Sequence, residues 1–191
     1  SSAERKNYTD AVLIGLKNTT SKIISFVDSD GQYDPKDLKR LYDKLEPGKI
    51  VIGYRHPRVD NIFRLFISGS FKKLYEILLK IKLKDPSCGY FIAYREDIEL
   101  IIKKDVAGLI KEGFWWEFYA RAYSLGIDIV ESPIEHRVRA AGETVVYRPT
   151  KIPSIAYEHI KGLRTLKNTL KNVFNLKTKS LFSIITAKEK M

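Results

Sequence analysis

Short runs of β-branched and aromatic residues alternate along this chain with longer segments whose apolar residues recur at helical spacing. The short runs, which have the length of buried strands, span residues 22–28, 50–54, 89–94 and 127–134. The longer segments, which have the period of amphipathic helices, span residues 10–18, 35–45, 61–83, 96–104 and 114–125. Strands that alternate with helices indicate an α/β domain with a mostly parallel sheet flanked by helices.

Ligands of such sheets bind at the carboxyl ends of the strands, which directs attention to the loops after Val27, Tyr54 and Tyr94. Asp28 and Asp30 follow the first strand and lie two residues apart, so an extended backbone directs both carboxylates to one side. Paired carboxylates favour Mg²⁺ or Mn²⁺, usually shared with substrate phosphates. A polar turn between strand and helix is the alternative, because Asp-Gly is a common turn pair.

A calcium-binding EF-hand loop is excluded as the origin of these carboxylates. That motif requires glycine at its sixth position and an acidic residue at its twelfth, and counting from Asp28 these positions are Tyr33 and Lys39. Asp34 directly precedes Pro35, which is typical of a helix start. We therefore expect Asp34 to cap a helix rather than to bind a metal.

Four motifs in a fixed order make the sequence similar to a known family. Residues 27–35 (VDSDGQYDP) resemble the D-A-D-G-Q-H-D-P signature of the family 2 glycosyltransferases with a GT-A fold, especially the dolichyl-phosphate mannose synthases and their polyprenyl-phosphate relatives. Residues 53–55 (GYR) resemble the family's G-S-R, residues 85–90 (DPSCGY) its D-P-T-S-G-F, and residues 139–144 (RAAGET) its R-x-x-G-E-S. The resemblance covers about residues 10–150.

The resemblance implies a GT-A fold and a metal-dependent reaction. A sugar, mannose or glucose, would move from GDP-mannose or UDP-glucose to a polyprenyl or dolichyl phosphate, with inversion at the sugar carbon. Asp28, Asp30 and Gln32 are implied to hold Mg²⁺ or Mn²⁺ on the donor diphosphate.

The same resemblance assigns roles on the acceptor side. Asp85, Arg64 and Arg139 are implied to be catalytic: Asp85 begins the loop that lines the sugar and acceptor, Arg64 faces a phosphate, and Arg139 closes a basic loop over a phosphate. Arg55 and Ser68 are implied to bind substrate, Arg55 at a phosphate group and Ser68 near the acceptor.

Two further residues are candidates for substrate binding. Glu117 lies on a strongly apolar helix and points into the site or, alternatively, lies on the helix surface in the first turn, where the helix dipole favours it. Arg137 shares a face with Arg139, and the alternative for both is a solvated charged edge. The two tryptophans beside Glu117 are expected in the core, and His136 is expected to be a structural or surface histidine.

The sequence departs from the family pattern in three places. Residues 6–9 (KNYT) match a G-K-G stretch only loosely, and Cys88 replaces a small polar residue. The family also begins with an apolar strand and an acidic residue that bind the nucleotide base, whereas only about 20 residues precede the metal-binding strand here. A chain that begins at Ser1 without these N-terminal nucleotide-binding strands is expected to be a fragment of a longer enzyme.

Positive charge is concentrated in two parts of the chain. The net charge is +11, and residues 151–191, with nine basic and two acidic residues, contribute +7 of it. Residues 61–84 hold six basic residues and one glutamate between apolar positions, a pattern typical of a membrane-surface helix or of a core helix with a solvated face. We expect a catalytic core over residues 1–150 and a basic, helical C-terminal extension over 151–191.

The charge and the single cysteine bear on partners and location. Positive charge favours anionic partners, here a nucleotide sugar, a polyprenyl phosphate and the membrane surface, with no nucleic acid. The alternative, a non-enzymatic basic module that binds anionic membrane or nucleic acid, does not account for the ordered motifs. One cysteine excludes an intramolecular disulfide, and no apolar run reaches the roughly 18 residues of a membrane span. The expected location is cytoplasmic and peripheral to the membrane.

Overall fold

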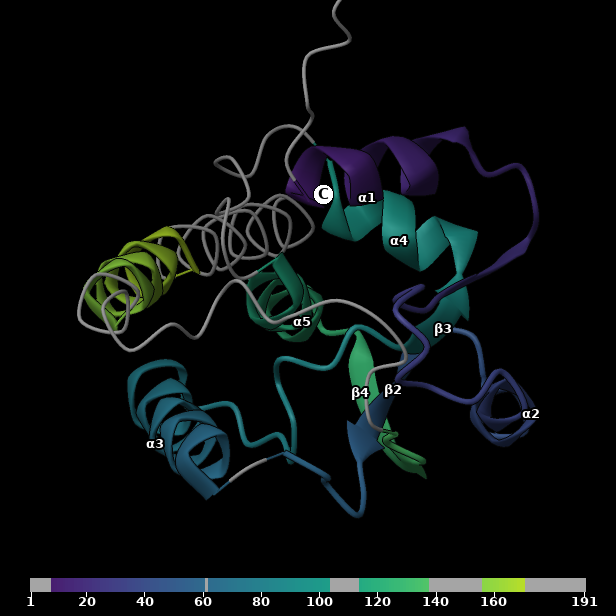
Figure 1. Ribbon diagram of the computed structural model, residues 1–191. Coiled ribbons are helices and arrows are strands. Elements are labelled where there is room, and N and C mark those ends of the chain that lie inside the picture. The colour runs from purple at the N-terminus through teal and green to yellow at the C-terminus, as the bar shows by residue number, and fades with distance from the viewer. Residues whose placement is uncertain (1–7, 61, 104–113, 138–155, 171–191) are drawn as a thin grey trace, which may run out of the picture.

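The computed structural model describes residues 8–60, 62–103, 114–137 and 156–170 (Figure 1). Its elements follow in the order α1 (Tyr8–Asn18), β1 (Ile23–Phe26), α2 (Asp37–Tyr42), β2 (Lys49–Arg55), α3 (Ile62–Leu79), β3 (Phe91–Tyr94), α4 (Arg95–Ile101), α5 (Phe114–Ser124) and β4 (Asp128–Ile134). Residues 156–170 are also helical. The strands and helices that the periodicity predicts are therefore confirmed, with ends that differ by a few residues.

The four strands form one sheet in the order β1-β3-β2-β4. β2 and β4 are parallel, but β3 runs antiparallel to both β1 and β2. The α/β class is confirmed: among the described strands, β1, β2 and β4 run in the same direction, as expected for a mostly parallel sheet, and β3 is the antiparallel strand. Alternation of strands and helices carries no information about the path of residues 80–90, and this connection enters β3 from the carboxyl ends of its neighbours.

The direction of β3 determines which of its two loops reaches the carboxyl ends of β1 and β2. Tyr94, the last residue of β3, pairs with Ile23 at the start of β1. At the other end, the Tyr90 carbonyl accepts a hydrogen bond from the Gly53 N–H of β2 over 2.8 Å. The loop before β3 therefore lies at the expected ligand-binding edge, and the expectation for the loop after Tyr94 is wrong.

Side chains that alternate along the strands pack against helices on both faces of the sheet. Ile50, Ile52 and Phe91 belong to the larger core, to which α1, α4 and α5 contribute. Val51 and Ile92 belong to a smaller core that includes one side chain of α2. Figure 1 shows α2 on the other side of the sheet from α1 and α4. Burial of each such side chain stabilises the fold by roughly 1.5–3 kcal/mol. Because side chains alternate along a strand, both faces of the sheet gain this stabilisation.

Helix α5 lies at the centre of the larger core. Nine of its eleven residues are buried, including both tryptophans, which confirms their expected place. The helical segment 156–170 packs against α3, because the rings of His159 and Phe71 lie 5.2 Å apart, and its Leu163 is fully buried. The described part of the C-terminal extension is thus helical and shares this core. The domain boundary at residue 150 stays a prediction.

Helix α3 lies at the outside of the molecule, away from the sheet (Figure 1). Only Tyr75 of this helix is buried, whereas Ile62, Phe63 and Phe66 are exposed. Within the described ranges, no helix combines the length and apolar character that crossing a bilayer requires. Helix α3 therefore carries an apolar surface that the described part of the chain leaves uncovered.

Candidate functional site

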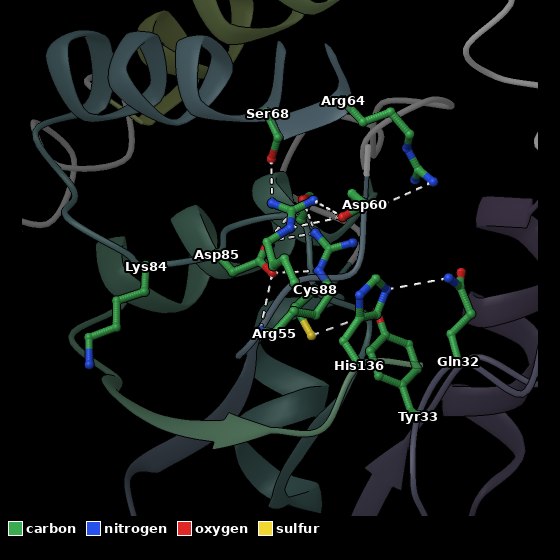
Figure 2. Close-up of polar contacts among 12 residues, drawn as sticks. Gln32, Tyr33, Arg55, Asp60, Arg64, Ser68, Lys84, Asp85, Cys88 and His136 are labelled. Atoms are coloured by element: carbon green, nitrogen blue, oxygen red, sulfur yellow. Dashed lines mark hydrogen bonds and ion pairs between the residues drawn. The ribbon is translucent and has the colours of Figure 1, made fainter. Parts of the chain in front are cut away.

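Four segments from distant parts of the chain meet at the sheet edge where β1 and β2 end (Figure 2). They are residues 28–32 after β1, 56–60 after β2, 85–89 before β3 and 135–137 after β4. β4 is parallel to β2 and therefore ends at the same edge. The antiparallel direction of β3 brings the third segment there, so the D-P-S-C-G motif lies at the same edge as the D-S-D-G-Q motif and the end of β2.

Asp28 and Asp30 are half-buried at the end of β1. The Tyr8 hydroxyl donates a hydrogen bond to Asp28 Oδ1 over 2.7 Å and accepts one from Trp115 Nε1 over 2.8 Å. Burial and the Asp28 carboxylate raise the pKa of Tyr8, so the hydroxyl keeps its proton and stays a donor. Asp30 Oδ1 accepts the Gln32 N–H over 3.1 Å, which is a local turn contact typical of aspartate.

Gly89 leaves space beside the Asp28 carboxylate. A Cβ at this position would lie 2.6 Å from Asp28 Oδ2 and 2.7 Å from Trp115 Nε1. A carboxylate offers about four lone-pair sites, so Asp28 can accept the hydrogen bond from Tyr8 and bind a cation at the same time. In the described ranges, no group of three or more His, Cys, Asp or Glu side chains is arranged to hold a metal. The pair of carboxylates fits an ion such as Mg²⁺, which one or two carboxylates and substrate phosphates bind together.

His136 connects the loop after β1 to the loop after β2. Its Nδ1 accepts the Val59 N–H over 3.3 Å, and its Nε2 lies 3.3 Å from Gln32 Nε2. Burial and the charge of Arg55 lower the pKa of His136, so its ring is neutral at neutral pH. Gln32 Nε2 also donates to the Arg137 carbonyl over 3.3 Å. His136 is confirmed as a structural residue, and the role of Gln32 as a metal ligand stays a prediction.

Arg55 and Asp85 form a buried ion pair between β2 and the loop before β3 (Figure 2). Arg55 Nε and Nη2 donate to the two Asp85 oxygens over 2.6 and 2.8 Å, which is the strong bidentate geometry. Burial by itself raises the pKa of Asp85, but the hydrogen bonds and charge of Arg55 outweigh it and hold this pKa below its usual value. Asp85 is therefore ionised and orients Arg55. Its catalytic role stays a prediction.

A second group of polar side chains surrounds Asp60, just before α3. Arg58 Nε and Nη2 donate to Asp60 Oδ2 over 2.9 and 2.7 Å, and Arg58 Nη1 donates to Ser68 Oγ over 2.7 Å. Arg64 Nη1 lies 3.0 Å from Asp60 Oδ1. Burial opposes ionisation of Asp60, but Arg58 and Arg64 outweigh it and lower its pKa. Arg64 and Ser68 thus meet through Arg58 and Asp60, two residues that the motifs did not identify.

Arg137 is engaged at the surface beside the loop after β1. Its guanidinium pairs with Asp34 and Glu135, and its backbone N–H donates to the Gln32 carbonyl over 2.8 Å. The structure therefore places Arg137 next to the candidate metal loop with its side chain in ion pairs. Its role in substrate binding stays a prediction, and Arg139 lies outside the described residues.

Glu117 lies inside the domain rather than on its surface. Its exposed fraction is 2%, and its Oε1 accepts a hydrogen bond from Arg121 Nε over 3.0 Å, one turn further along α5. The interpretation of Glu117 as a helix-surface residue is therefore wrong. Arg121 supplies the partner that a buried charge requires. A role of Glu117 in substrate binding stays a prediction.

Comparison with known sequences places the chain in a family. The model of glycosyl transferase family 2 matches residues 1–101, more than half of the chain. An undecaprenyl-phosphate mannosyltransferase of Micrococcus luteus is 32% identical over 123 residues, which are 62% of this chain and 50% of that protein. A polyprenol monophosphomannose synthase of Mycolicibacterium smegmatis is 29% identical over 136 residues, which are 67% of this chain and 50% of that protein. The chain thus spans about half the length of these relatives.

Comparison with solved structures supports the fold. Glucosyl-3-phosphoglycerate synthase from Mycobacterium tuberculosis, in complex with Mn²⁺, UDP-glucose and phosphoglyceric acid, aligns with a TM-score of 0.61 at 18% identity, over 87% of this chain and 56% of that one. At this identity the likeness concerns the fold alone, and it confirms the expected GT-A fold. With this fold and the match to the family model, the chain belongs to glycosyl transferase family 2.

Proposed function

We propose that this chain carries the metal-binding and acceptor-binding site of a glycosyltransferase that moves mannose or glucose from GDP-mannose or UDP-glucose to a polyprenyl phosphate. One observation carries the proposal: Asp28, whose carboxylate lies beside the space at Gly89, and Asp30 lie at the same sheet edge as the arginines at and after the end of β2. Carboxylate pairs favour divalent cations, and guanidinium groups favour phosphates. The names of the two mannosyl-transferring relatives support a polyprenyl acceptor.

The proposed reaction forms one bond and breaks one bond at the sugar carbon. An oxygen of the acceptor phosphate forms the new C–O bond, while the C–O bond to the nucleoside diphosphate breaks and its electron pair leaves with the diphosphate. A single displacement of this kind inverts the configuration at that carbon. Because the acceptor phosphate is already anionic, no strong general base is needed. The protein must therefore mainly orient and neutralise the two phosphate-bearing substrates.

The residues at the sheet edge divide between these tasks. Asp28 and Asp30, with Gln32 as a further oxygen ligand, would hold Mg²⁺ or Mn²⁺ against the donor diphosphate. Such an ion, when bound, neutralises charge on the leaving diphosphate. Arg55, which Asp85 holds in a bidentate pair, contributes positive charge that is oriented before substrate binds.

Helix α3 is the element that we assign to the membrane side of the acceptor site. Ile62 and Phe66 are 86% and 72% exposed, and they belong to the same helix as Arg64 and Ser68. A helix with exposed apolar residues and basic neighbours lies in the headgroup region of a bilayer. The acceptor's phosphate would then lie at the arginines and its apolar chain along the apolar residues. This arrangement supports a location peripheral to the membrane.

Transfer of labelled sugar to a lipid tests the proposed activity. The full-length enzyme that contains this chain is incubated with radiolabelled GDP-mannose or UDP-glucose, Mn²⁺ or Mg²⁺, and vesicles that contain polyprenyl phosphate, and the label in the extracted lipid is counted. We expect transfer from one of the two donors, and we expect a chelator to stop it. No transfer with either donor, together with strong metal-independent binding of DNA, would favour the basic-module interpretation instead.

Vesicle flotation tests the membrane side of α3 without requiring catalysis. Phe66→Ser removes an exposed aromatic side chain, whose burial in a bilayer contributes roughly 1.5–3 kcal/mol, so we expect at least about tenfold weaker partitioning into anionic vesicles. Tyr42→Ser is the matched control, because Tyr42 is an exposed aromatic residue of α2. If both variants and the native protein floated equally, the assignment of α3 to the membrane side would be wrong.

A further inference from the structure

Asp60 is a buried carboxylate that holds two arginines at the start of α3 (Figure 2). Its side chain is 1% exposed, its Oδ2 accepts two hydrogen bonds from Arg58, and its Oδ1 lies 3.0 Å from Arg64 Nη1. A carboxylate so enclosed does not reach a ligand in solvent. Its influence on any ligand must therefore act through the two guanidinium groups that it orients.

Arg58 has donors left over after these contacts. A guanidinium has five N–H groups, and Arg58 uses two of them on Asp60 and one on Ser68. One N–H on Nη1 and one on Nη2 thus have no acceptor among the residues that the structure describes. The Arg58 and Arg64 side chains are 21% and 25% exposed, so ligands can reach them. Two N–H groups on adjacent nitrogens match two oxygens of a phosphate.

The charges in this region favour an anion. Arg58 and Arg64 carry two positive charges against the single negative charge of Asp60, and nearby Arg55 is already paired with Asp85. Charges that are partly buried interact more strongly than charges in bulk water. A phosphate monoester has three terminal oxygens and a charge close to −2. It can therefore satisfy both arginines and accept from the Ser68 hydroxyl.

The family resemblance already implies that Arg64 and Ser68 lie at the acceptor phosphate; we propose that Arg58 completes a clamp with them for the terminal phosphate, and that Asp60 is the positioning residue that sets its geometry. This inference rests on the proposed function and extends it to Arg58 and Asp60. The acceptor phosphate, rather than the donor diphosphate, is the assigned ligand because the clamp lies on α3 and the loop that enters it, and α3 is also the helix that carries the exposed Phe66. The candidate metal ligands of the donor follow β1 instead.

Asp60→Asn distinguishes positioning from simple charge by the sign of its effect. The substitution removes a negative charge that repels the ligand, so affinity would rise if the arginines acted only as charges. If Asp60 positions them, the new amide nitrogen faces a guanidinium, the geometry is lost and affinity falls. We expect calorimetry with farnesyl monophosphate to show a Kd about tenfold higher, which corresponds to the loss of about one charge-assisted hydrogen bond.

Two other variants complete the experiment. Arg58→Lys keeps the positive charge but removes the planar fork, and we expect the Kd for farnesyl monophosphate to rise about tenfold as well. Asp43→Asn removes an exposed carboxylate that pairs with Lys39 on α2, and we expect no change. Circular dichroism tests whether each variant is folded. If Asp60→Asn does not fold, the result for Arg58→Lys decides the question. Affinity equal to or higher than the native value in either folded test variant overturns the proposal.

Two further ligands separate the clamp from the proposed activity. Inorganic phosphate is expected to compete with farnesyl monophosphate, whereas GDP with Mn²⁺ is expected to bind native protein and Asp60→Asn equally. If Asp60→Asn lost only GDP binding, the clamp would belong to the donor. If native protein did not bind farnesyl monophosphate, the clamp would be excluded. Either result overturns the inference. Prenyl phosphate binding that depends on Asp60, without any sugar transfer, would contradict the proposed function and leave the clamp standing.

Discussion

Replacing Asp28 with asparagine is expected to remove Mn²⁺ binding and to lower sugar transfer by at least about a hundredfold, since losing even an outer partner of a metal ligand costs about 10- to 100-fold. Asparagine has the same shape, and its oxygen can still accept the Tyr8 hydroxyl bond that Asp28 accepts over 2.7 Å. The fold should therefore survive while the negative charge is lost. Asp30→Asn is expected to act in the same way. Electron paramagnetic resonance of free Mn²⁺ gives the protein-bound fraction by difference.

The control for these substitutions is Asp128→Asn. Asp128 is exposed at the start of β4, at the end of that strand away from the candidate site, so its carboxylate should not influence the metal. We expect native Mn²⁺ binding in this variant. If Asp28→Asn and Asp30→Asn both bind Mn²⁺ as tightly as the control, the carboxylates after β1 are not the metal ligands.

Gly89→Ala reaches the same carboxylate without changing any charge. The added methyl group would lie 2.6 Å from Asp28 Oδ2 and 2.7 Å from Trp115 Nε1, so one of the two side chains must move. We expect weaker Mn²⁺ binding and a destabilisation of about 1–3 kcal/mol, as for other overpacked sites. Gly15→Ala is the matched control, because a Cβ at Gly15 of α1 meets no atom within 4 Å and alanine favours a helix.

The elements of the fold could be predicted from the sequence because their signals are local. The apolar run 50–54 and the helical spacing of 114–125 each lie within one element, and both elements are present as β2 and α5. The direction of β3 could not be predicted in this way. It depends on how residues 80–90 return to the sheet, and no periodicity within β3 distinguishes a parallel strand from an antiparallel one. The strand pairs in the described part of the chain show that β3 is antiparallel to both β1 and β2.

Some features of the candidate site could likewise be predicted from local sequence, whereas others depend on the topology of the sheet. Asp28 and Asp30 are two residues apart, so their common placement follows from strand geometry. The pair of Arg55 and Asp85 joins residues thirty positions apart, and it exists because β3 is reversed. A local signal was nevertheless present for Asp60, which lies four residues before Arg64, the spacing of helical ion pairs.

The spacing of four also accounts for the burial of Glu117. On an otherwise apolar helix, a single glutamate is expected at the surface because an isolated buried charge is costly. Arg121 lies four residues later and supplies the compensating charge. The spacing therefore predicts the partners of Asp60 and Glu117, which are Arg64 and Arg121, although it does not predict that these carboxylates are buried.

Replacing Asp85 with asparagine is expected to destabilise the fold by about 3 kcal/mol, the lower end of the range for breaking one side of a buried ion pair. The Arg55 and Asp85 side chains are 10% and 4% exposed, so water does not compensate the charge that Arg55 keeps. Asparagine retains one oxygen for Arg55, which limits the loss. Urea unfolding followed by circular dichroism measures the change. Asp43→Asn, which alters an exposed pair with Lys39, should change stability little, because exposed pairs contribute little.

The pH dependence of this difference tests its electrostatic origin. Arg55 holds the pKa of folded Asp85 below its usual value, and in the unfolded chain that pKa is about 3.9. The unfolded state therefore takes up the proton first as the pH falls, so the contribution of Asp85 is complete above about pH 4 and is lost toward the lower folded-state pKa. The stability difference between native protein and Asp85→Asn should accordingly shrink in acid. A difference that stays constant below about pH 4 would mean that the ion pair is not its cause.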